Sequence, residues 1–220
     1  RRPLLGLALL LLTLAVPALS AAQEDRVVEV VEVTGLLDDR LLRFVADSIE
    51  AAAAAGTVEV VILQIDSRGV VGNPALLAEV VGLVSDPPLP VVAWIGPEPA
   101  GAYGGARQLA VAAPLTFAAP RTSIGHWAPT IAGAPDSETL VAAPSEEELV
   151  LLTGPEAGVD VVAPETASPR QVAQYLHGRT LPGGDRPLET VWPFGGESGV
   201  TVLETVIRQP GLADRYLRLG

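Results

Sequence analysis

Hydrophobic positions follow two different periods along the chain. Nearly continuous runs rich in valine and isoleucine occupy residues 27 to 34, 58 to 65 and 91 to 95. Runs of this kind are typical of strands that are covered on both faces. The segments between them carry apolar residues at helical spacing, as Leu42 and Ile49 do. This alternation predicts an α/β protein with a largely parallel central sheet and right-handed crossover helices.

Residues that favour helix ends mark where these helices start and stop. Asp38 precedes the first helix as an N-cap, and Gly56 follows it as a C-terminal glycine. A second helix is predicted at residues 74 to 84, and a third at about residues 101 to 112. Ser168 marks the start of another helix.

The pattern weakens in the second half of the chain. Short strands are predicted near residues 115 to 118 and at residues 159 to 162. Between them, residues 130 to 148 are rich in Ala, Pro, Ser and Glu without a clear period, which predicts a loop or lid. We expect a short helix at residues 146 to 152. Further on, residues 200 to 207 form a short amphipathic segment.

The N-terminus has the features of an export signal. Two arginines precede an apolar run from residue 3 to about residue 19, and small residues follow around Ala22. This order is typical of a secretory signal peptide, although the run also reaches the minimum length of a membrane anchor. Both interpretations place the rest of the chain on the extracytoplasmic side. The chain then divides into residues 1 to 22, a main domain at residues 23 to 180, and a C-terminal tail at residues 181 to 220.

Composition excludes several kinds of chemistry. The net charge is −12 and the acidic residues are scattered, so we do not expect nucleic acid as a partner. The chain has no cysteine and only two histidines, His126 and His177, so we expect no disulfide, no metal site and no cofactor. All 14 basic residues are arginine, and arginine cannot replace lysine as a general base.

Residues 97 to 107 (PEPAGAYGGAR) have the form of a turn at the mouth of an active site. A predicted strand leads into this stretch, and an apolar helical pattern leads out of it. The small residues around Gly104 allow a ligand to approach the backbone closely. The stretch nevertheless carries no Ser, Cys, His, Asp or Lys that could act in catalysis.

Four segments, in this order, resemble the NfeD-like proteins, which are membrane-bound ClpP-class serine proteases of the ClpP/crotonase superfamily. The segments are residues 66 to 70 (DSRGV), 101 to 108 (GAYGGARQ), 124 to 129 (IGHWAP) and 158 to 181 (GVDVVAPETASPRQVAQYLHGRTL). The resemblance covers roughly residues 27 to 180. It implies a ClpP/crotonase-like fold, self-association, a peptide ligand and a stomatin-like (SPFH) membrane partner. The last residues also resemble the family's approach to a transmembrane helix, which implies a membrane region after them.

The family's catalytic parts are missing from this chain. The resemblance implies a serine activated by a lysine, with backbone amides of a Gly-Gly turn holding the oxyanion. Ala106 stands at the nucleophile position, and no Ser or Cys lies between Ser85 and Ser123. The chain has no lysine, and Val70 follows Gly69 where the family has a second glycine. We therefore interpret the chain as a pseudoprotease that acts in binding or assembly at the membrane.

Two further interpretations remain for residues near this turn. Ser123, His126 and Asp66 could form a new Ser-His-Asp triad, which would make the chain an active membrane-bound endopeptidase with a non-standard nucleophile. The simpler alternative is that these groups satisfy local backbone atoms, with Asp66 capping the turn after its strand. Tyr103 and Arg107 either bind a peptide carboxylate or fill the former cleft. The candidate binding residues are Gly69, Gly104, Gly105, Tyr103 and Arg107.

Overall fold

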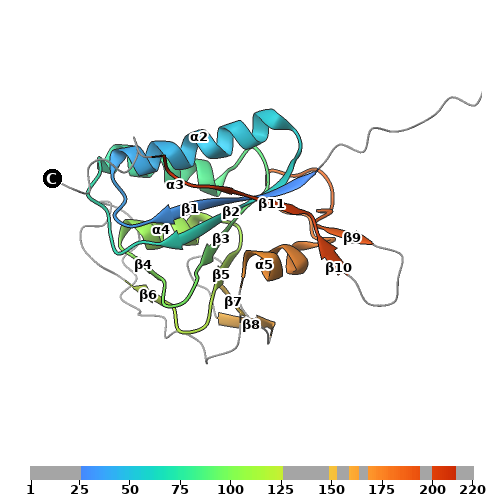
Figure 1. Ribbon diagram of the computed structural model, residues 1–220. Coiled ribbons are helices and arrows are strands. Elements are labelled where there is room, and N and C mark those ends of the chain that lie inside the picture. The colour runs from blue at the N-terminus through green and yellow to red at the C-terminus, as the bar shows by residue number, and fades with distance from the viewer. Residues whose placement is uncertain (1–25, 126–148, 153–158, 164–167, 194–199, 212–220) are drawn as a thin grey trace, which may run out of the picture.

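A seven-stranded sheet forms the centre of the protein (Figure 1). The computed structural model describes residues 26–125, 149–152, 159–163, 168–193 and 200–211. The strand order is β11-β1-β2-β3-β5-β7-β8; neighbours from β11 to β5 are parallel, whereas β7 and β8 are antiparallel. The strands are β1 (Val27–Thr34), β2 (Val58–Asp66), β3 (Val91–Ile95), β5 (Thr116–Ala118), β7 (Leu149–Leu152), β8 (Val159–Ala163) and β11 (Glu204–Arg208). The predicted fold class is confirmed.

Helices cover both faces of this sheet, and each face has its own apolar cluster (Figure 1). On one face lie α2 (Asp39–Ala55), α3 (Pro74–Ser85) and α4 (Gly105–Ala112), whereas α5 (Pro169–Leu176) lies on the other. Side chains of β1 alternate between the clusters, because successive residues of a strand point to opposite faces. Burial on both faces explains why the central strands read as continuous apolar runs.

The predicted ends of helix α2 are confirmed. The Asp38 carboxylate accepts hydrogen bonds from the backbone N–H of Arg40 at 3.1 Å and of Leu41 at 2.8 Å. Gly56 ends the helix with φ of 70°, a left-handed conformation that glycine adopts without strain. Helix α3 begins with Pro74 after an Asn73 cap, which satisfies an amide that has no partner within the helix.

The predicted helix at residues 101 to 112 is wrong in its first part. The structure places a strand there, β4 (Gly101–Tyr103), and helix α4 starts only after Gly104. Strand β4 pairs in parallel with β6 (Ser123–Gly125), a strand that sequence reasoning missed. Alanine favours a helix whereas glycine disfavours one, so the local sequence did not decide the conformation, and pairing with a distant segment determined the result.

Two expectations for the second half also need correction. Residues 149 to 152 form strand β7 between β5 and β8, not the end of a helix. The apolar run LVLL suits either conformation, and only its neighbours in the sheet select the strand. Residues 200 to 207 divide between β10 (Val200–Val202) and β11. The expected loop at residues 130 to 148, like residues 1 to 22, lies outside the described residues.

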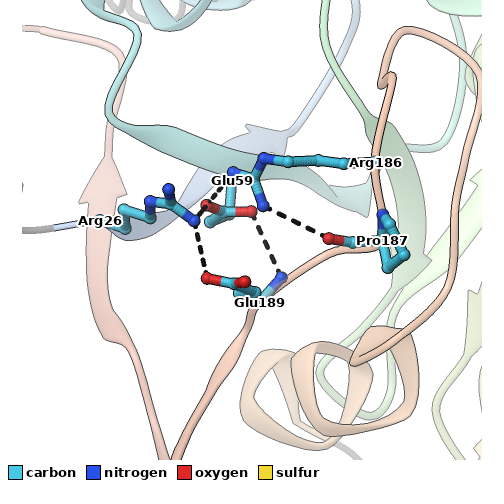
Figure 2. A network of polar contacts seen from close by, with 5 residues as sticks. All are labelled: Arg26, Glu59, Arg186, Pro187 and Glu189. Carbon is cyan, nitrogen blue, oxygen red and sulfur yellow. Dashed lines mark hydrogen bonds and ion pairs between the residues drawn. The ribbon is translucent and has the colours of Figure 1, made fainter.

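Residues after position 180 contribute to the same sheet and core. Leu181, Leu188 and Thr190 are buried, and β9 (Val191–Pro193) pairs with β10 in a small antiparallel sheet. Figure 2 shows how a polar network holds this region against β2 through the buried carboxylate of Glu59. The domain boundary at residue 180 stays a prediction. In the described parts of the chain, no helix has both the length and the apolar character needed to span a bilayer.

Candidate functional site

Two turns meet at the carboxyl ends of β2 and β3. The turn at residues 66 to 70 follows β2, and the segment that leads through β4 into α4 follows β3. Gly101 O accepts a hydrogen bond from Ser67 N at 2.7 Å, and Ser67 O accepts one from Tyr103 N at 3.1 Å. In open α/β sheets, ligands bind at the carboxyl ends of the strands. The two segments with family-like motifs therefore form one candidate site.

Asp66 takes part in joining these two turns. Its Oδ1 accepts a hydrogen bond from the backbone N–H of Gly101 at 3.0 Å. We expected this carboxylate either to cap the turn after its own strand or to serve in a triad. Its observed partner belongs to β4 instead, so the carboxylate positions the strand that leads to the nucleophile position. That partner is distant in sequence, and no local signal predicts it.

Ala106, which the family resemblance places at the nucleophile position, is fully buried. It lies in the same apolar cluster as Val70. A β-carbon built on Gly105 would lie only 3.1 Å from Val70 Cβ and 2.6 Å from Leu77 Cδ2. The Val70 side chain therefore packs directly against the first turn of α4.

The backbone angles of the two turns agree with the residues they contain. Gly69 has φ of 155° and Gly104 has φ of 54°, values that residues with a side chain rarely adopt. Val70 has no positive φ, and Arg121 is the one described residue other than glycine that has one. A β-branched residue rarely adopts a left-handed backbone, and these angles agree with that preference.

Ser123 is held by its neighbours in the β4–β6 pair. Its Oγ accepts a hydrogen bond from the Tyr103 hydroxyl at 2.5 Å, and its backbone N–H donates to Ala100 O at 3.1 Å. Gly101 lies beneath both side chains, since a β-carbon there would lie 2.7 Å from the Tyr103 ring. His126 lies outside the described residues. The triad of Ser123, His126 and Asp66 therefore stays a prediction.

Arg107 follows the nucleophile position on α4. Its side chain is half-buried, and its Nε has no hydrogen-bond partner among the residues that the structure describes. Burial lowers the pKa of this guanidinium, because removing a cation from water disfavours its charged form. Both sequence interpretations of Arg107 stay open, since an anionic group or simple packing would suit this environment.

An open groove of about 610 Å³ runs beside the turn at residues 66 to 70. It is lined by Gly35, Leu36, Asp38, Asp39, Val71, Gly72 and Asn73. Two apolar side chains stand at its surface, Leu36 at 49% exposure and Val71 at 65%. Sequence reasoning did not select them, although Val71 directly follows the motif at residues 66 to 70. Hydrogen bonds from Leu37 N to Gly69 O and from Val71 N to Leu37 O connect the groove to the turn.

The described residues contain no group of three acidic or histidine side chains placed to bind a metal ion. The chemical groups that hydrogen bonds place at these turns are the Asp66 carboxylate, bound to Gly101 N, and the hydroxyls of Tyr103 and Ser123, bound to each other. Such a set can hold a peptide by hydrogen bonds and charge, and the adjacent groove offers apolar contacts.

Comparisons with known proteins agree with this fold. No protein-family model matches the sequence, and no curated protein matches it. A mutant of the 1510-N membrane-bound stomatin-specific protease, in complex with a substrate peptide, has a TM-score of 0.55 and 18% sequence identity over 88% of this chain and 96% of that chain. The 1510-N membrane protease specific for a stomatin homologue from Pyrococcus horikoshii has a TM-score of 0.53 and 18% identity over 87% of this chain and 96% of that chain. This similarity confirms the predicted ClpP/crotonase-like fold.

Proposed function

We propose that this chain is an exported, membrane-associated pseudoprotease domain that binds a partner and has lost hydrolysis. The observation that carries the proposal is the contact between Val70 and the first turn of α4, with Ala106 buried in the same cluster. A ClpP-class hydrolase needs open space between its oxyanion turn and its nucleophile for the substrate carbonyl. The position of Val70 against Gly105 and the burial of Ala106 support the view that this chain has no such open space.

Residue chemistry supports the same conclusion independently. The Ala106 methyl cannot attack a carbonyl, and a chain without lysine offers no amine to activate a hydroxyl. A single loss could be compensated by a nearby group, whereas loss of the nucleophile, the base and half of the oxyanion turn removes each step of acyl transfer. The fold and the connection between the turns persist without them.

The retained function is binding of an extended apolar peptide segment in the groove beside Leu36 and Val71. Apolar side chains exposed around a groove are a common feature of protein interaction sites. The structurally similar 1510-N protein is described as specific for a stomatin homologue. We therefore propose a stomatin-like membrane protein as the partner. The apolar N-terminal run supports a membrane location on the extracytoplasmic side.

The test of lost hydrolysis is the mass of the intact full chain after incubation with a fluorophosphonate, a reagent that modifies activated hydroxyls. We expect no adduct on the folded protein. A stoichiometric adduct that maps to Ser123 and disappears in Ser123→Ala would overturn the proposal and establish an active endopeptidase.

Ala106→Ser is a matched variant for the same assay. It restores the hydroxyl at the family's nucleophile position, but we still expect no adduct because the position is buried and the chain has no lysine to serve as the base. An adduct on Ala106→Ser would contradict the packing argument.

For the binding half of the proposal, Leu36→Asp and Val71→Asp should abolish crosslinking to a stomatin-like protein in membranes. Unchanged crosslinking in both variants would refute the groove as the binding surface.

A further inference from the structure

The last described strand, β11, forms one edge of the central sheet (Figure 1). One side of β11 pairs in parallel with β1, from Glu204 beside Val27 to Arg208 beside Val31. No other described strand pairs with its outer side. The side chains from Glu204 to Ile207 are exposed, with Val206 at 38% and Ile207 at 58%. An exposed edge with apolar side chains is a ready template for another strand.

Several polar contacts hold β11 in place. Arg208 forms an ion pair with Glu29 of β1, whose carboxylate is only 2% exposed. Gln209 Nε2 donates to Glu32 Oε1 at 2.9 Å, and Leu203 N donates to Thr190 O at 3.0 Å just before the strand. A strand held at both ends needs little further ordering when a partner pairs with it, which favours association.

The sequence of β11, ETVIR, is complementary to itself in the antiparallel direction. A two-fold axis at Val206 would place Glu204 opposite Arg208 of the partner subunit, and Thr205 opposite Ile207 of the partner subunit. Residues directly opposite each other point to the same face, where opposite charges stabilise the pair and like charges destabilise it. A parallel arrangement in register would instead place glutamate against glutamate.

We propose that a second copy of this chain binds here, so that two β11 strands pair antiparallel about Val206 and join two sheets. Such an interface is isologous: each contact occurs twice, and the assembly closes at two subunits. The inference goes beyond the proposed function and does not depend on it. The outer edge of β11 lies apart from the turn at residues 66 to 70, so the pairing is possible whether or not the chain hydrolyses peptides.

Cysteine crosslinking tests this pairing directly, because the natural chain has no cysteine. In Val206→Cys the two new thiols face each other, with α-carbons about 4.5 to 5.5 Å apart, within the range that a disulfide needs. Under mild oxidation of the full chain in membranes, we expect Val206→Cys to become mostly disulfide dimer. Glu50→Cys is the control for random collision, since Glu50 is exposed on α2 and lies outside the groove. Equal dimer yield from both variants would overturn the proposal.

Two more variants test the register. Thr205→Cys alone should crosslink poorly, because its opposite residue is Ile207 and not itself. A mixture of Thr205→Cys with Ile207→Cys should form the mixed dimer efficiently. If Thr205→Cys crosslinks to itself as well as Val206→Cys does, the two-fold axis at Val206 is wrong. Crosslinking is the suitable readout because five paired residues form a small interface that dissociates quickly.

A charge reversal tests the complementarity of Glu204 with Arg208. In the Val206→Cys background, Glu204→Arg places arginine against arginine at two symmetric positions, so the crosslinking yield should fall about ten-fold. Glu50→Arg, an exposed site on α2, is the matched control and should leave the yield unchanged. The same loss in both variants, or in neither, would refute the antiparallel pairing. Arg208 itself is left unchanged because it holds the buried Glu29.

Discussion

The polar network around Glu59 allows a quantitative prediction (Figure 2). The Glu59 side chain is 3% exposed, and Oε1 lies 2.9 Å from Arg26 Nη1 and 2.5 Å from Arg186 Nη2. Oε2 accepts a hydrogen bond from Glu189 N at 3.3 Å. The two arginine side chains remain 37% and 44% exposed. The network is therefore asymmetric, since the anion is buried and both cations reach water.

This asymmetry predicts which substitution lowers the free energy of unfolding most. In Glu59→Gln the arginines recover their hydration and the amide oxygen can still accept hydrogen bonds, so the free energy of unfolding should fall by about 1 to 2 kcal/mol. Arg26→Ala or Arg186→Ala alone should cost about 1 kcal/mol, because the other guanidinium still neutralises Glu59. The double variant leaves a buried carboxylate without a cation and should cost about 3 to 5 kcal/mol, more than the sum.

The assay is urea unfolding followed by tryptophan fluorescence, with the melting temperature as a second measure. The double variant should melt roughly 10 °C below the parent, given about 2 to 4 °C per kcal/mol at this chain length. The control, Arg43→Ala with Arg170→Ala, removes the same charge from exposed helix positions and should change little. If the loss in the double variant of Arg26 and Arg186 equals the sum of the single losses, or is no larger than that of Glu59→Gln, the reasoning is refuted.

Three further predictions use the same unfolding assay. Gly105→Ala should lower the free energy of unfolding by about 1 to 3 kcal/mol, because the new methyl group would lie 2.6 Å from the nearest side-chain carbon. Gly82→Ala has open space around it in α3 and should raise the free energy of unfolding by up to about 1 kcal/mol. Equal effects of the two substitutions would contradict the packing at Gly105. Burial raises the pKa of Glu29 above 4.5 even though Arg208 opposes this shift. The folded chain therefore holds this proton more tightly than the unfolded chain, and it loses stability as pH rises from 4.5 through the raised pKa. Glu29→Gln should remove this part of the pH dependence of stability, and a pH profile identical to the parent's would refute the prediction. Asp38→Ala should cost about 1 kcal/mol because two backbone amides of α2 lose their acceptor, and no loss would exclude the cap as a stabilising feature.

Parts of the fold could be predicted from the sequence because their signals are local. The continuous apolar strands, the Asp38 cap and the Gly56 end depend on residues within one element, and the structure confirms them. Strand β4 was missed because its conformation depends on Ser67 and on β6, which lie far away in sequence. Strand β7 was missed for the same reason, since an apolar run of four residues suits a helix as well as a strand.

For the candidate site, the sequence by itself determined which chemistry is absent. A chain with no lysine and no cysteine, and with alanine at the nucleophile position, lacks those groups whatever its conformation. Tertiary structure alone decided that Val70 packs against the first turn of α4, that Asp66 accepts a hydrogen bond from Gly101, and that β11 becomes an edge of the central sheet. The physical reason is that side-chain chemistry belongs to each residue, whereas packing and strand pairing depend on segments that only folding brings together.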